Sequence, residues 1–285
     1  MGVDFSQTIM VGRQSLNVRP DVSASILKPI GIPREQAIAA LKGQWAEPLF
    51  ALLGAQQVDS IDASDYEQAT HIYDFNQRLP MSLMNQFSVV HDGGTIEHVF
   101  NIPQAFKNCM EMVRPGGHFI QVSAANNYMG HGFWQFSPEL IYRIFSRESG
   151  FQIKAVLLHE PKKMLATGAS FGTWYKVDDP ATHYCRVELT NQIPTYICTI
   201  AQKVANAAIL ARFPQQSDYA EAWQRTGMPQ SADASPVHAP IAQAPPSAMR
   251  KLVRRSLNLF NKMPSGFERP YYKRVSDDDI VRGRI

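Results

Sequence analysis

The sequence predicts an α/β protein built on one doubly wound sheet that is mostly parallel, with one antiparallel strand near the C-terminal end of the domain. Short apolar segments alternate with helical patterns through most of the chain. These segments lack strict polar alternation, which is typical of strands buried on both faces. Acidic residues follow several of them directly, as expected where ligands bind at the carboxyl ends of parallel strands.

The predicted strands are short runs rich in β-branched and aromatic residues. The first is TIMVGRQSLNV (8–18), whose buried part ends at Gly12. We expect further strands at VDSIDAS (58–64), THIYDFN (70–76), FSVVHDG (87–93), HFIQVSA (118–124) and FQIKAVLLHE (151–160). YCRVELT and TYICTIAQKV flank NQIP, so these two segments are expected to form a closing antiparallel hairpin.

Three helices are expected between these strands. REQAIAALKGQWAEPLFALLGAQ (34–56) has a helical pattern with Gly54 as a C-cap, and IPQAFKNCMEMV (102–113) is followed by a break at RPGG (114–117). SPELIYRIFSRES (137–149) opens with Ser137 as N-cap and Pro138 at the first helical position.

The composition changes near residue 228 and predicts four segments. Residues 1–213 form the α/β domain, 214–227 a helical extension, 228–248 a linker rich in Pro, Ala and Ser, and 249–285 a basic amphipathic tail. Residues 1–248 carry 18 Lys+Arg against 21 Asp+Glu, whereas 249–285 carry 10 against 4. Residues 249–262 could therefore lie on an anionic membrane surface, contact a partner protein, fold back over the core, or remain a solvated tail. The acidic body argues against a nucleic-acid partner.

The cysteines and the hydropathy pattern indicate the compartment. Cys109, Cys185 and Cys198 are far apart and form no C-x-x-C pair, which fits a reducing environment. MGVDFSQTIMVGRQ lacks the pattern of a signal peptide, and no apolar run reaches the ~20 residues of a membrane span. We expect a cytoplasmic protein that could be peripheral at the inner membrane surface.

Three acids stand at successive strand ends: Asp62, Asp74 and Asp92. An acid after the second strand can accept both ribose hydroxyls of a nucleotide-like ligand, and an acid after the third can meet an adenine amino group. Any one of them could instead cap a helix or turn the chain. Their convergence on one crevice favours ligand binding.

FSVVHDGGTIEHVFNIPQAFKNCMEMVRPGGHFIQV resembles a strand, helix and strand of class I S-adenosylmethionine-dependent methyltransferases, through its Glu-His segment and its Arg-Pro-Gly-Gly. IDAS resembles their ribose-binding turn, and the closing strand pair resembles the antiparallel hairpin that separates them from nicotinamide-binding folds. The resemblance covers roughly residues 58–203. It implies a Rossmann-like domain and S-adenosyl-L-methionine as cofactor.

The resemblance also implies cofactor contacts. The family's G-x-G-x-G loop is absent, and only Gly12 and Arg13 stand in its place. The expected contacts are Gly12, Arg13, Asp92 and Gly93 on the methionine side, Asp62 and Ala63 at the ribose, and Asp74 and Phe75 at the adenine. The missing glycines leave open a non-catalytic relative that only binds a partner.

Methyl transfer to a hydroxyl requires an aligned acceptor and removal of its proton. His98 is the first candidate for the base, His131 the second, and Glu97 would orient the base or cap the helix. Alternatively, His98 only packs on the cofactor. Some relatives hold a metal with Glu-x-x-Glu-His, but Gly94 stands at the first acid position here. Two ligands are too few for a hard cation, so no metal is expected.

SAANNYMGHGFWQFSPEL follows the fifth strand, where acceptors bind in the resembled family. Amides and aromatic faces suit a polyhydroxylated ring, so a carbohydrate-like or small-molecule acceptor is expected. The proposed contacts are Asn126, Asn127, Tyr128, Phe133, Trp134 and Gln135. Alternatively, these side chains only anchor the loop. A nicotinamide-dependent oxidoreductase is disfavoured, because G-x-G-x-x-G is absent after the first strand.

Overall fold

The computed structural model describes residues 2–16, 18–161, 172–183, 186–226, 267, 269–283 and 285. Within this part of the chain the backbone forms a nine-stranded sheet in the order β3-β2-β1-β4-β5-β8-β6-β7-β9. The predicted linker and the amphipathic segment 249–262 lie outside the described residues, as does Cys185.

Seven of the nine strands lie close to predicted positions, whereas β7 and β9 were not predicted. They are β1 Gln7–Val11, β2 Gln57–Asp62, β3 His71–Ile72, β4 Phe87–Asp92, β5 Val113–Asn126, β6 Phe151–Glu160, β7 Thr173–Val177, β8 Thr195–Lys203 and β9 Tyr272–Val275. Parallel pairing runs from β3 through β2, β1 and β4 to β5. The chain order reverses between β1 and β4, and this switch point is where doubly wound sheets bind ligands.

The prediction of a closing hairpin is wrong. Residues 186–190 form no strand, and β8 pairs antiparallel with β5 on one side and with β6 on the other. Its Ile197 and Ala201 are fully buried in the main core. The expectation of a single antiparallel strand is also wrong, since β7 runs antiparallel to β6 and β9 antiparallel to β7.

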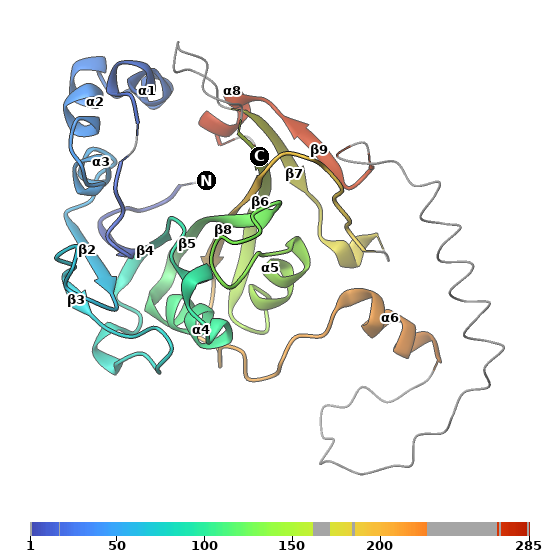
Figure 1. Ribbon diagram of the computed structural model, residues 1–285. Helices are drawn as coiled ribbons and strands as arrows, with labels where there is room; N and C mark the ends of the chain where they lie inside the picture. The colour runs from blue at the N-terminus through green and yellow to red at the C-terminus, as the bar shows by residue number, and fades with distance from the viewer. Residues whose placement is uncertain are drawn as a thin grey trace.

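The basic tail contributes to the same sheet. β9 forms its last strand, and Tyr271 and Tyr272 beside it are buried in the main core. Residues 267 and 269–283 therefore belong to the α/β body, although the charge pattern had separated them from it. In Figure 1 this segment lies next to β7, at the edge of the sheet far from β3.

The single helix expected over 34–56 is broken into two shorter helices, α2 Arg34–Leu41 and α3 Glu47–Leu52. A further helix, α1 Pro20–Leu27, precedes them. Gly43 and Pro48 interrupt the pattern, since proline fits only at the start of a helix. The remaining helices are α4 Ile102–Met112, α5 Pro138–Ile144, α6 Ser217–Thr226 and α8 Asp277–Val281, with 3-10 turns at Lys28–Ile30, Met81–Leu83, Ile96–His98 and Pro180–Thr182.

Helices cover both faces of the sheet (Figure 1). Along β1, Ile9 and Val11 belong to the core that α4 and α5 cover, whereas Met10 points to the other face and packs with Phe50 of α3. This alternation follows from the two-residue period of a strand. Within the described residues, none of the helices combines the length and hydropathy needed to cross a bilayer.

Candidate functional site

The strand register brings the predicted strand-end residues to one edge of the sheet. Val11 of β1 is paired with Ile61 of β2 and with Asp92 of β4. The Gly12 amide donates to the Ile61 carbonyl at 2.8 Å. Gly12, Asp62 and Asp92 therefore end neighbouring parallel strands side by side, which is the arrangement that the sequence predicted.

Asp92 shapes the loop that follows β4. Its Oδ1 accepts hydrogen bonds from the Thr95 amide at 2.9 Å and the Ile96 amide at 3.4 Å, and its Oδ2 accepts one from Gln121 Nε2 at 3.0 Å. Burial, and secondarily the neighbouring Glu97, raise the pKa of the Asp92 carboxyl to about 7. Asp92 is fully buried and positions the loop through these hydrogen bonds. It has no exposed atom that could contact a cofactor, contrary to the prediction.

Glu97, His98 and His131 form a compact cluster. One ligand atom from each lies within 4.8 Å of the other two. Glu97 Oε1 is 3.5 Å from His131 Nε2, and the two imidazoles meet edge to face with centroids 5.1 Å apart. Glu97 is 1% exposed, and its Oε2 has no hydrogen-bond partner among the described residues. The carboxylate and the two imidazoles could accept a proton or act together as ligands of a divalent cation.

The cluster is assembled by a close contact between two loops. The Phe133 amide donates to the Glu97 carbonyl at 2.8 Å, and the Trp134 indole donates to the Val99 carbonyl at 3.0 Å. Gly132 has φ +71°, and a Cβ there would lie 2.8 Å from the Glu97 carbonyl oxygen. The loop after β5 thus needs a glycine next to His131 to pack against the Glu97 backbone.

The place of the missing glycine-rich loop is taken by Gln14, which the sequence analysis overlooked. Its Nε2 donates to the Val11 carbonyl at 2.7 Å and to Thr95 Oγ1 at 3.2 Å, and so links the ends of β1 and β4. A Cβ on Gly93 would run into Gln14 Oε1. The Gln14 amide therefore lies over Gly93, on the methionine side of the predicted cofactor site.

Arg13 is engaged elsewhere. Its Nε donates to Glu47 Oε1 at 2.7 Å, a second nitrogen donates to the Glu67 carbonyl at 3.0 Å, and its guanidinium lies 4.5 Å from the centre of the Trp45 ring. These contacts tie α3 to the loop after β2. The predicted contact of Arg13 with the cofactor has no support in this arrangement.

The residues expected at the nucleoside side differ in accessibility. Asp62 is half-buried at the end of β2, and its Oδ1 accepts from the Ala63 amide at 2.6 Å. Asp74 is exposed, and hydrogen bonds from the backbone and side chain of Asn76 lower the pKa of its carboxyl. Phe75 is 5% exposed and packs in the main core, so its ring has no open face for an adenine.

Most polar side chains of the acceptor loop are bonded within the protein. Asn126 and Asn127 both donate to Asn191 Oδ1 at 2.7 Å, and Gln135 accepts from the Tyr128 amide at 3.1 Å. These bonds support the alternative in which the amides anchor the loop. Asn191 is more than sixty residues away in the sequence, so no local pattern could have shown this contact.

Aromatic rings surround the His131 imidazole. Tyr128 lies 5.6 Å from it and 4.8 Å from the ring of Tyr196 on β8. Phe133 is 65% exposed and meets Phe100, itself 70% exposed, edge to face at 5.7 Å. The surface beside the cluster therefore presents exposed aromatic side chains.

The residues at the strand ends fit S-adenosylmethionine on one condition. Asp62 can meet a ribose, and Gly12 and Gly93 leave the backbone uncovered by side chains of their own. The Gln14 amide must swing aside or itself contact the methionine end. His98 and His131 follow the neighbouring strands β4 and β5, on the same edge of the sheet.

No family model matches the chain, and no curated protein matches it. Similar solved structures include a SAM-dependent methyltransferase from Thermotoga maritima (10% identity, TM-score 0.37), which covers 70% of this chain and 82% of that one. One from Methanosarcina mazei (13%, 0.36) covers 56% and 89%. One from Aquifex aeolicus (10%, 0.32) covers 70% and 84%. At these values the similarity supports no statement about activity.

Proposed function

We propose that this chain is a class I S-adenosylmethionine-dependent methyltransferase that transfers a methyl group to a hydroxyl of a small or carbohydrate-like acceptor. The observation that carries the proposal is the position of the Glu97, His98 and His131 cluster at the carboxyl edge of a sheet whose strand β8 runs antiparallel between β5 and β6. The insertion of β8 distinguishes this sheet from the six-stranded parallel order of dinucleotide-binding domains.

The cofactor, when bound, supplies an electrophilic methyl carbon on a sulfonium. Asp62 would hold its ribose, and the backbone at Gly12 and Gly93 would approach its methionine end beside Gln14. Its sulfur would be the leaving group and would keep the electron pair of the C–S bond, while the acceptor oxygen would take the methyl group. The protein must align the acceptor, which contributes up to about 7–11 kcal/mol in favourable cases.

The acceptor's proton would go to His98 or His131. Both imidazoles are exposed to solvent, whereas Glu97 is buried. A carboxylate at 3.5 Å from His131 Nε2 stabilises the imidazolium that forms when the proton arrives. Glu97 therefore acts as the orienting group and the two histidines as alternative bases.

A second candidate mechanism uses the same three side chains as ligands of a divalent cation that would bind the acceptor hydroxyl. The unpartnered Glu97 Oε2 and the spacing of the three ligand atoms favour it. Two histidines and a carboxylate make a common catalytic metal site that leaves positions open for substrate. Chelation separates the two: the base mechanism predicts full turnover in EDTA, and the metal mechanism predicts a loss that one divalent cation restores.

The remaining alternative is a methyltransferase-like protein without activity. The presence of Gln14 where the family has its glycine-rich loop favours this alternative. Titration calorimetry with S-adenosylhomocysteine tests the proposal. Saturable binding in the micromolar range supports it. Binding of NAD, with no binding of S-adenosylhomocysteine, would instead point to an oxidoreductase.

A further inference from the structure

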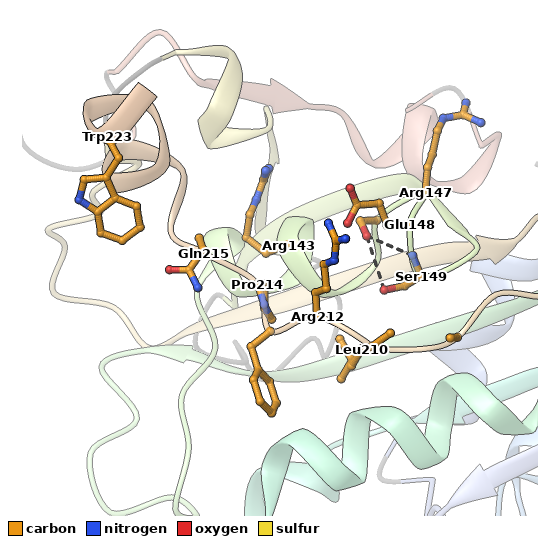
Figure 2. A pocket seen from close by; sticks show the side chains of 13 residues that line it. Arg143, Arg147, Glu148, Ser149, Leu210, Arg212, Pro214, Gln215 and Trp223 are labelled. Carbon is orange, nitrogen blue, oxygen red and sulfur yellow. Dashed lines mark hydrogen bonds between the residues drawn. The ribbon is translucent and has the colours of Figure 1, made fainter. Parts of the chain in front are cut away.

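An open cleft lies at the opposite edge of the sheet from the histidine cluster. Phe151, the first residue of β6, pairs with Lys203, the last of the antiparallel β8, so the segments before and after them meet at the amino ends of the parallel strands. Residues 146–149, 208 and 210–215 line the cleft together with side chains from α5 and α6 (Figure 2). Its volume of about 920 Å³ is within the range of small-molecule sites.

Three arginines line this cleft, and two of them form no ion pair with the described residues. Arg143 is held by ion pairs with Asp179 and Glu139. Arg147 and Arg212 are exposed, and neither side chain forms an ion pair or hydrogen bond with the described residues. Glu148 is the acidic residue in the lining. The cleft therefore keeps an excess of positive charge.

The cleft offers two kinds of recognition group. Arg147 comes from the turn between α5 and β6, Arg212 and Gln215 come from the segment between β8 and α6, and Trp223 comes from α6 (Figure 2). A guanidinium fork matches the oxygens of a phosphate, and an indole offers a face on which a planar ring stacks. Tyr219 packs against Trp223 with ring centroids 6.0 Å apart and so supports the indole.

We propose that this cleft binds a phosphorylated small molecule with a planar ring, of the nucleotide type. Arg212 takes the phosphate, Arg147 adds positive charge at the edge of the cleft, and Trp223 packs against the ring. Glu148 and Gln215 provide acceptors for hydroxyl or amino groups. A long nucleic acid is disfavoured, because residues 1–248 carry 18 basic against 21 acidic residues and provide no extended basic surface.

The test is a calorimetric titration of the full-length protein with adenosine 5′-monophosphate and with inorganic phosphate. Arg147→Ala/Arg212→Ala should weaken both by at least about tenfold, because the variant loses charge-assisted hydrogen bonds to the phosphate. Trp223→Leu should weaken the nucleotide by about tenfold and leave phosphate binding unchanged. Arg34→Ala/Arg274→Ala, which removes two exposed arginines elsewhere, should stay within about twofold of the wild type.

A titration in the presence of saturating S-adenosylhomocysteine distinguishes this cleft from the proposed cofactor site at the other edge of the sheet. Nucleotide binding should persist under these conditions. The proposal is overturned if the nucleotide does not bind saturably, if S-adenosylhomocysteine displaces it, or if the double arginine variant binds as the wild type does. Binding of a single-stranded oligonucleotide about 100-fold tighter than the mononucleotide would instead identify a nucleic-acid surface.

Discussion

Glu97 Oε1 lies 3.5 Å from His131 Nε2, although Glu97 follows β4 and His131 follows β5. The contact exists because the loop after β5 hydrogen-bonds to the Glu97 carbonyl through the Phe133 amide. A buried carboxylate thus faces an exposed imidazole across two loops. In the proposed mechanism, this pairing would orient the His131 imidazole as a proton acceptor.

Replacing His131 or His98 with alanine should lower methyl-transfer turnover while cofactor binding stays within about twofold. A positioned general base typically contributes 10²–10⁴-fold, so the loss at the true base should lie in that range. The rate is measured as S-adenosylhomocysteine released with a panel of hydroxylated acceptors, and affinity by calorimetry. If both variants retain the full rate, the assignment of the base is wrong.

Gly132→Ala should disturb the cluster far more than Gly130→Ala. Both glycines have positive φ, +71° and +88°, so both variants carry a similar backbone strain. Only the Cβ at position 132 meets the Glu97 carbonyl, at 2.8 Å, whereas nothing lies within 4 Å of a Cβ at 130. We expect Gly132→Ala to cost about 1–3 kcal/mol more in unfolding free energy, measured by urea denaturation. Equal losses for the two variants would show that the loop yields freely.

Gln14→Ala should tighten the binding of S-adenosylhomocysteine about 2–10-fold. The amide hydrogen bonds to the Val11 carbonyl and Thr95 Oγ1 must break before a ligand occupies the space above Gly93, at a cost of about 0.5–1.5 kcal/mol. Gln44→Ala, which truncates an exposed glutamine of the same region, is the matched control. Weaker binding by Gln14→Ala would mean that the amide contacts the ligand.

His91 should make unfolding stability depend on pH below neutrality. Burial lowers the pKa of its imidazole from 6.5 to about 4. The unfolded chain therefore takes up the proton first, so the contribution of His91 is complete above about pH 6.5 and is lost as the pH falls towards 4.

His91→Phe keeps the edge-to-face contact with Phe50, whose ring centroid lies 5.3 Å from that of His91. This variant should lose less stability than the wild type between pH 6.5 and 4, by at most about 3 kcal/mol. Denaturant titrations at fixed pH measure the difference. Parallel curves for the two proteins would show that His91 is not buried in its neutral form.

The segment from β4 to β5 could be predicted from the sequence because its signals are local. β4 and α4 begin and end within a residue or two of the expected positions. The expected break at 114–117 is instead part of β5, where Gly116 takes φ +84° and the register with β4 shifts. A glycine pair in a sequence is typical of a turn, but here the strand accommodates it as an irregularity in its pairing.

The remaining features depend on contacts between distant residues. Gln14 bonds to Thr95, Asn191 bonds to Asn126, and β9 joins β7 across nearly a hundred residues. No periodicity or spacing encodes such pairs. The same is true of β8, whose apolar pattern marks a buried strand but does not select β5 and β6 as its two neighbours.

The most direct test of the central claim is a calorimetric titration of S-adenosylhomocysteine into the wild-type protein and Asp62→Ala. The account predicts saturable micromolar binding by the wild type and at least about tenfold weaker binding by the variant, since a lost hydrogen bond to a charged group is worth about 1.5–3 kcal/mol. Absence of binding to the wild type, or equal binding by both proteins, would contradict an adenosyl site at the end of β2.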